Sequence, residues 1–197
     1  MSFWASSLAR VVQVGLLAFT PGLTVLGLYK RFGMADAAMA VANDAFQSRV
    51  GGIAAVLSGL GKLFGGQVAD RFGFRRGTIA NTLLQVSVML ALPFTLQNRT
   101  AFAACVCGAL FSLGGSISMY VTVNAQTFGV RNAGEIYSLL FSALALASVF
   151  GAKLTAALLP SIGWGGVFRL LAAMGVVNLG MLALLKRETA KPAAWDL

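Results

Sequence analysis

The sequence has no histidine, only two cysteines and only six acidic residues among its 197 positions. A chain without histidine, and with a single Cys105-x-Cys107 pair, lacks the ligand clusters of metal sites and the cysteines of a disulfide framework. No nucleophile–base pair and no phosphate-cradling loop occurs at catalytic spacing either. We therefore expect neither an enzyme nor a bound cofactor, and we interpret both cysteines as small apolar packing residues.

Charge of either sign is scarce, and apolar residues take its place. Charged residues make up 11% of the chain and hydrophobic residues 58%, and the mean hydropathy is +0.81. A soluble domain carries about 25% charged residues, so much of this surface must face lipid. The net charge of +9 would suit nucleic acid, but the basic residues lie between apolar runs. We therefore expect no nucleic-acid partner, because the positive-inside rule explains this placement better.

Six apolar runs are long enough to cross a bilayer, which takes about 20 helical residues for a hydrocarbon core of ~30 Å. They predict an all-α integral membrane protein with a single domain over residues 1–197. The first run lacks the early basic region and cleavage site of a signal peptide, so it counts as a span. The predicted spans cover about residues 11–28, 50–69, 77–97, 101–123, 136–159 and 166–185.

The basic residues also predict an orientation. Of the 15 lysines and arginines, eight fall on the side of the two termini, four fall on the other side and three lie within spans. Loops rich in lysine and arginine stay in the cytoplasm. We therefore expect cytoplasmic termini in a multi-pass protein of a plasma or inner membrane.

The loop between the second and third runs carries the most informative motif. It lies within the stretch GKLFGGQVADRFGFRR from Gly61 to Arg76 and has the form G-x-x-x-D-R-x-G-x-R-R. The matching residues are Gly66, Asp70, Arg71, Gly73, Arg75 and Arg76. This pattern resembles the loop signature of the major facilitator superfamily of secondary transporters, G-x-x-x-D-R/K-x-G-R/K-R/K. One residue departs from it, because Phe74 is inserted after the second glycine.

These residue types also make physical sense without the family. Gly73 permits the positive φ that a tight reversal needs. Asp70 lies at the C-terminal end of a predicted helix, where the dipole disfavours an anion, so it needs a cationic partner or the N-terminus of another helix. The alternative is a basic loop that only sets topology.

A second stretch resembles a narrower group of transporters. The residues Phe128-Gly129-x-Arg131-Asn132-x-Gly134-x-x-Tyr137 are similar to the loop before the eleventh helix in the oxalate/formate antiporter and monocarboxylate-porter branches. Ser138 stands where that pattern has glycine. The resemblance implies helices seven to twelve, the C-terminal half of a twelve-helix fold, with substrate bound between the halves. The partner would be the missing N-terminal six-helix half or a second copy, and whether Met1 is the natural start stays open.

Lys62 is the main candidate for substrate binding. An ionisable group near the centre of a span costs about 2.5–3.5 kcal/mol on insertion scales, and Lys62 lies too deep to reach the surface easily. It shares a helix face with Gly59, Gly66 and Asp70, and no predicted span contains an acidic residue. In the antiporter branch a basic residue here resembles part of the anion site. The alternatives are a lysine satisfied by carbonyl groups or paired with a carboxylate.

Three further residues are weaker candidates for substrate binding. Lys153 lies near the outer end of the fifth span, but oxalate-type members carry their lysine at the position of Leu144, which is on the opposite face. This departure puts dicarboxylate specificity in doubt. Asn81 and Gln85 lie four residues apart on the third span, where they would either bond neighbouring helices or face a cavity.

The sequence thus predicts half of a secondary transporter that moves a small organic anion, such as a mono- or dicarboxylate, by alternating access. Lys62 would recognise the charge, and Asp70 with its arginines would form a cytoplasmic latch. Two alternatives stay open at this point. One is a six-helix partner subunit or remnant that does not transport, and the other is a transporter of an uncharged solute or a drug.

Overall fold

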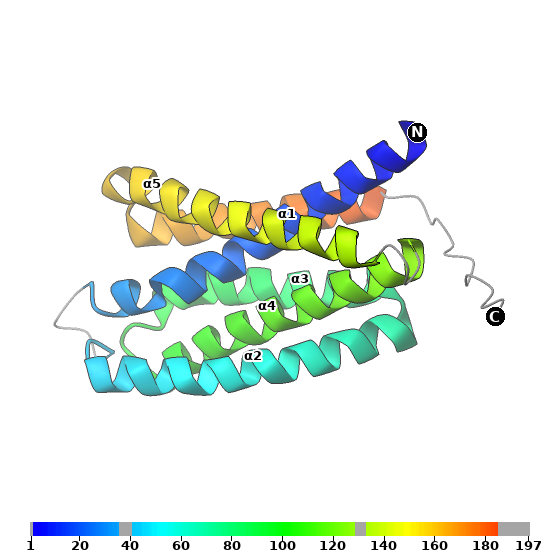
Figure 1. Ribbon diagram of the computed structural model, residues 1–197. Coiled ribbons are helices and arrows are strands. Elements are labelled where there is room, and N and C mark those ends of the chain that lie inside the picture. Colours follow the sequence, from blue (N-terminus) through cyan, green and yellow to red (C-terminus); the bar gives the residue numbers. More distant parts are fainter. Residues whose placement is uncertain (1, 36–40, 129–132, 185–197) are drawn as a thin grey trace.

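The computed structural model describes the backbone of residues 2–35, 41–128 and 133–184, and the side chains of residues 16–35, 41–123, 137–138 and 141–182. Over these residues the regular structure is helical and contains no strand, which confirms the expected all-α class (Figure 1). The elements are α1 (Ser2–Gly33), α2 (Asp44–Phe72), α3 (Phe74–Ala91), the short 3-10 helix η1 (Leu92–Phe94), α4 (Arg99–Phe128) and α5 (Ala133–Leu184).

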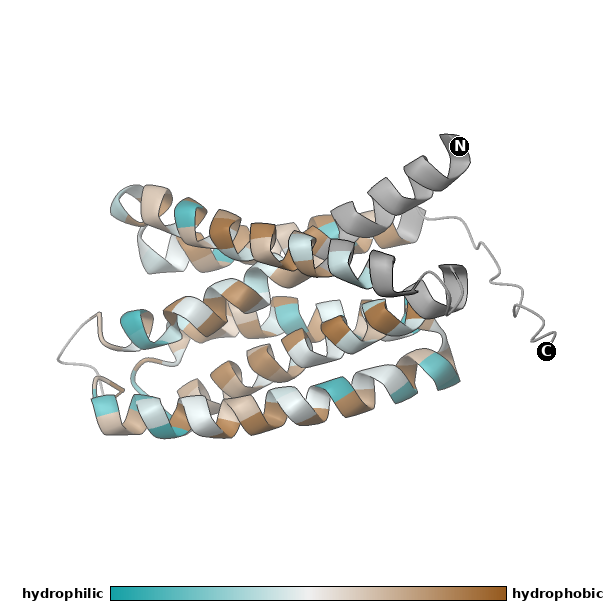
Figure 2. Cartoon of the chain, viewed as in Figure 1, coloured by the Kyte–Doolittle hydropathy of each residue, from teal (hydrophilic) through white to brown (hydrophobic). Residues whose placement is uncertain are grey.

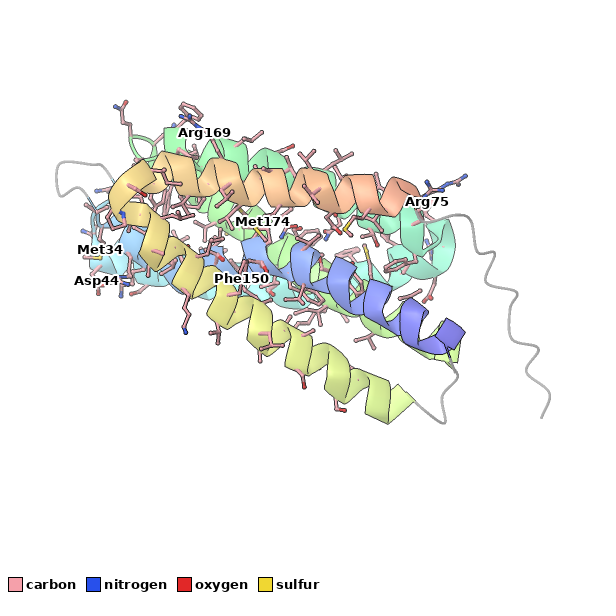
Figure 3. The ribbon with its side chains drawn as sticks, turned by 90° about the horizontal axis from the view of Figure 1, so that it is seen from above. Met34, Asp44, Arg75, Phe150, Arg169 and Met174 are labelled. Carbon is pink, nitrogen blue, oxygen red and sulfur yellow. The ribbon has the colours of Figure 1, made fainter. Side chains whose placement is uncertain are left out.

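The fifth and sixth predicted spans are joined in one element, α5. Gly163 interrupts its helical backbone with φ 64° and ψ 178°, a conformation that is nearly restricted to glycine. Pro160 precedes it and cannot donate a backbone hydrogen bond. The chain therefore reverses at Gly163, and the two arms of α5 diverge from this turn toward the other end of the bundle, with α1 between them (Figures 1 and 3). We expected residues 160–165 to separate the two spans, and in the structure the helical backbone is interrupted at Gly163 alone.

Helices α1, α2 and α4 are longer than the apolar runs that predicted them, whereas α3 ends at Ala91, before the predicted end near residue 97. α2 begins at Asp44, where the Asn43 side chain accepts a hydrogen bond from the Phe46 N–H at 3.0 Å. Polar residues of this kind form the end turns of a helix. A prediction based on apolar runs leaves these turns out. By length and composition four segments could cross a membrane among the described residues: Asp44–Phe72, Phe74–Phe94, Arg99–Val123 and Phe141–Leu182. Six spans with cytoplasmic termini, and one domain over the whole chain, stay predictions.

The helices form a bundle with two distinct ends. The start of α1, the α2–α3 turn and the end of α5 lie at one end, which we call the signature end (Figure 1). In Figure 3, Arg75 projects at this end, and Met34 and Asp44 lie at the other. At that opposite end the Lys30 ammonium pairs with the Asp44 carboxylate at 2.6 Å. The hydrogen bond to Asp44 and its charge raise the pKa of Lys30.

Aromatic side chains fill the core at the opposite end. The Phe32 ring of α1 lies 6.3 Å from Phe102 of α4, and 5.3 and 4.8 Å from Trp164 and Phe168 in the second arm of α5. We call these four residues the Phe32 cluster. Hydrophobic residues occur along each of the helices that Figure 2 colours rather than in one of them. Val56 and Phe94, for example, are 68% and 83% exposed, as expected for side chains that meet lipid.

Candidate functional site

Close packing of α2 on α4 fixes the direction in which Lys62 points. Gly61 and Gly65 are buried, and a Cβ atom on either residue would meet backbone atoms of α4. On the other helix, a Cβ atom on Gly114 would meet the Ser58 carbonyl of α2. Small residues let helix backbones approach in this way in membranes. The two helices are thus in close contact through these glycines, and Lys62, next to Gly61, is exposed.

Two kinds of residue share the exposed surface of α2. Ile53 and Val56 are bulky and 57% and 68% exposed. Gly52 and Gly59 occupy a different sector, where an added Cβ atom would meet nothing within 4 Å. Lys62 lies one turn after Gly59 and therefore belongs to the sector of small residues. This sector has room for a partner or a ligand beside the ammonium group.

Hydroxyl groups of α4 border the same sector one turn further along. A Cβ atom on Gly66 would lie 3.1 Å from Ser118 Oγ and 3.9 Å from Thr122 Oγ1. In the described part of the chain, Lys62 has no carboxylate or hydrogen-bond partner. An ammonium without a partner, on a helix whose next turn lies against hydroxyl groups, is chemically suited to a carboxylate ligand, which accepts several hydrogen bonds at once.

Lys153 lies on the first arm of α5, away from the contact with α1. Gly151 and Thr155 flank it in sequence and are buried, and a Cβ atom on Gly151 would meet the Thr24 side chain of α1. Lys153 is exposed and has no ion-pair partner among the described residues. Leu144, at the position of the family's lysine, joins the apolar cluster around Phe19. No described contact joins Lys62 to Lys153 or to Leu144.

Asn81 and Gln85 both bond neighbouring helices. The Asn81 side-chain amide donates to the Ser112 carbonyl at 3.0 Å and to Ser116 Oγ at 2.8 Å, both on α4. The Gln85 amide donates to the Ala18 carbonyl of α1 at 3.1 Å. Both side chains are buried. Of the two alternatives expected for Asn81 and Gln85, the structure shows hydrogen bonds to neighbouring helices. Contact with a substrate stays a prediction for both.

The signature residues adopt the geometry expected of a tight turn. Gly73 has φ 82° and ψ 149° between α2 and α3, which confirms the predicted positive φ. Asp70, Arg71, Arg75 and Arg76 are all exposed at the signature end. The latch role predicted for them stays a prediction. Arg131 and Asn132, on which the second family resemblance depends, lie outside the described residues.

Sequence reasoning missed one aromatic column near the signature end. Tyr120 of α4 contacts Phe19 of α1 and Phe74 of α3, with ring centroids 5.2 and 5.3 Å apart and edge-on geometry. Its hydroxyl is fully buried and has no hydrogen-bond partner in the described structure. The inserted Phe74 was the available signal, because an apolar residue inside a basic loop usually contacts the core.

Comparisons with known proteins extend this picture. The family model described as Major Facilitator Superfamily matches residues 3–196. Apicoplast pyruvate carrier 2 of Toxoplasma gondii is 29% identical over 184 residues, which are 90% of this chain and 27% of the carrier. The oxalate:formate antiporter of Oxalobacter formigenes is 29% identical over 131 residues, 66% of this chain and 31% of the antiporter.

A relative with a different kind of name matches the same share of the chain. Multidrug resistance protein MdtM of Salmonella typhimurium is 30% identical over 133 residues, 66% of this chain and 31% of that protein. The chain thus spans 27 to 31% of the length of these three relatives. Their names include carboxylates and drugs, so the family relationship leaves the substrate class open.

Proposed function

Because the chain belongs to the major facilitator superfamily, whose members are transporters rather than enzymes, we propose that it is part of a secondary transporter for a small organic anion. The expected substrate is a mono- or dicarboxylate, moved across a plasma or inner membrane by alternating access. The aligned residues make up only 27% and 31% of two matched relatives, which supports a second helical body beside this one. That body would be an N-terminal six-helix half or a second copy of the chain.

Lys62 is the observation that carries the proposal. It lies within the candidate span Asp44–Phe72, and an uncompensated charge there costs several kcal/mol. A carboxylate substrate would supply the missing negative charge and would gain charge-assisted hydrogen bonds. The small residues beside Lys62 leave space for such an anion at the surface that would meet the second body. Lys153, also exposed, is a secondary candidate on the other flank.

The signature residues fit a conformational role in the same proposal. Binding near the midplane between two bodies requires their ends to open and close in turn. Asp70, Arg71, Arg75 and Arg76 lie exposed at one end of the bundle, where they can exchange ion pairs with the second body. Gly66 and Gly73 allow the close approach and the turn that place them there.

Mutation of Lys62 in the complete transporter tests the binding role. We expect Lys62→Ala to reduce counterflow of labelled oxalate, formate or pyruvate in proteoliposomes at least tenfold, and Lys62→Arg to restore part of it. Arg49→Ala is the matched control, because it removes an exposed cation from the same helix at its far end. Counterflow that is equal in Lys62→Ala and wild type would reject Lys62 as the anion ligand.

Two other functions stay in contention. The matched multidrug resistance protein supports transport of a drug or an uncharged solute, which predicts saturable uptake that carboxylates do not inhibit. A partner subunit that does not transport is the other alternative. It predicts that no substrate of either class is taken up, even when the chain is reconstituted with its second helical body.

A further inference from the structure

A pocket lies at the α2–α3 turn, far from Lys62 along the helix. Its volume is about 370 Å³, and it is lined by Phe72, Gly73, Arg75, Arg76 and Ile79. This volume falls in the range of about 300–1,000 Å³ that small-molecule sites occupy. Two of the five lining residues are arginines and none is acidic. The pocket therefore favours an anionic group.

The backbone around the pocket is held in place by contacts on its inner side. The Phe74 ring lies edge-on to Tyr120 at 5.3 Å. Thr78 Oγ1 donates to the Phe74 carbonyl at 2.8 Å, and the Gly77 N–H donates to the Gly73 carbonyl at 3.2 Å. With Phe74 turned inward, the next residue along the helix, Arg75, projects from the end of the bundle (Figure 3). These contacts fix the backbone that carries the two arginines of the lining.

The pocket also lies at a defined depth. One candidate span ends at Phe72 and the next begins at Phe74, so the turn between them is at the membrane–water boundary. Lipid phosphate groups are concentrated at this level. The Phe72 ring is 62% exposed, and aromatic rings with one wet side favour this interfacial region.

We propose that this pocket binds a phosphate group, supplied by the headgroup of an anionic phospholipid in the adjoining leaflet. The guanidinium groups of Arg75 and Arg76 match the geometry of phosphate oxygens and can bond them in pairs. Phe72 and Ile79 offer apolar contacts to the glycerol and the start of the acyl chains. The site is separate from the substrate proposal, and its binding does not require Lys62.

The rival explanation is diffuse attraction between a basic loop and an anionic membrane, worth about 1 kcal/mol for each lysine or arginine. Diffuse attraction depends on the number of charges and not on which arginine is removed. A built pocket depends on Arg75 and Arg76 in particular. A variant pair with equal charge loss therefore separates the two explanations.

Native mass spectrometry of the full chain in neutral detergent, with added phosphatidylglycerol, provides the test. We expect one retained lipid, with phosphatidylcholine bound at least tenfold more weakly. Arg75→Gln/Arg76→Gln should weaken phosphatidylglycerol binding at least tenfold. Arg31→Gln/Arg49→Gln, with the same charge loss among exposed residues at the opposite end, should leave it within twofold. Circular dichroism confirms that each variant keeps its helices.

Two results would overturn the proposal. Equal loss of lipid in both double variants would show diffuse attraction instead of a pocket. Inorganic phosphate cannot make the contacts with Phe72 and Ile79 and should therefore compete poorly with a bound lipid. Displacement of the lipid by millimolar phosphate would assign the site to a soluble anion instead. Phe72→Ala should accordingly weaken lipid binding and leave phosphate binding unchanged. Lys62→Ala should retain the lipid, so this test does not depend on the transport proposal.

Discussion

A buried amide inside a membrane protein has no water to bond, so its partners in the protein decide what it contributes. Asn81 illustrates this at the scale of one residue. Its amide bonds a carbonyl and a hydroxyl of α4, and Ser112 Oγ donates back to the Asn81 carbonyl at 3.2 Å. The three bonds join α3 to α4 at a single level of the bundle. Lys62 differs from Asn81 because it is exposed and has no such partner among the described residues.

Replacement of Asn81 should therefore destabilise the bundle. We expect Asn81→Ala to lower the free energy of unfolding by about 1–2 kcal/mol, since interhelical hydrogen bonds in membranes contribute about 0.6 kcal/mol on average and up to about 1.7. Ser87→Ala is the control, because Ser87 is exposed on the same helix and bonds only the Leu83 carbonyl one turn away. Denaturant titration in mixed micelles measures both. An unchanged unfolding free energy with impaired transport would favour a substrate contact for Asn81.

At the scale of one element, α2 has two functions on two sides. Its buried side approaches α4 so closely that only glycine fits at Gly61 and Gly65. Its exposed side carries Lys62 among residues that leave open space. Glycine thus serves two purposes in α2. On the buried side it permits close contact with α4, and on the exposed side it leaves open space beside Lys62.

Alanine substitutions on the two sides should consequently have opposite effects. A Cβ atom on Gly65 would lie 2.6 Å from the Gly115 carbonyl oxygen and 2.7 Å from its Cα, and backbone atoms cannot move aside cheaply. We expect Gly65→Ala to cost about 1–3 kcal/mol of unfolding free energy. Gly59→Ala adds its methyl group to open space and should be neutral or stabilising by about 0.5–1 kcal/mol. Equal losses in thermal unfolding would contradict the packing described for α2.

The sequence predicted more about α2 and its turn than about its partners. The apolar run, the glycine spacing and the positive φ of Gly73 are local properties, and each was predictable from nearby residues. The partners of Asn81 and Gln85 were not, because they depend on which helices lie side by side. The same holds for Tyr120, whose surroundings come from α1 and α3. The reversal at Gly163 lies within residues 160–165, which separate the fifth and sixth predicted spans, so its place was predictable. Its restriction to a single residue was not, because no polar linker marks this turn.

At the scale of the whole molecule, the two ends of the bundle differ in composition. The signature end carries the exposed residues Asp70, Arg71, Arg75 and Arg76. The opposite end has the Phe32 cluster and the Lys30–Asp44 ion pair. The cytoplasmic placement of the signature end stays a prediction from the distribution of basic residues along the sequence.

Cysteine labelling tests this orientation. In a background with Cys105 and Cys107 replaced by alanine, we expect Ala45→Cys to react with an impermeant maleimide in intact cells. Arg75→Cys should react only after the membrane is permeabilised. Both positions are exposed in the bundle, so accessibility to the reagent reports the side of the membrane. The reverse pattern would invert the predicted topology.

The Phe32 cluster also has a consequence for biosynthesis. Phe32 belongs to α1, whereas Trp164 and Phe168 belong to the second arm of α5 and are synthesised later. At about 5–20 residues per second, the segment between them takes on the order of 10 s to synthesise. During this interval α1 is inserted without the aromatic rings that later cover Phe32. α1 therefore needs a temporary neighbour, either lipid or the insertion machinery, and the native contact is completed only after the second arm of α5 has been synthesised.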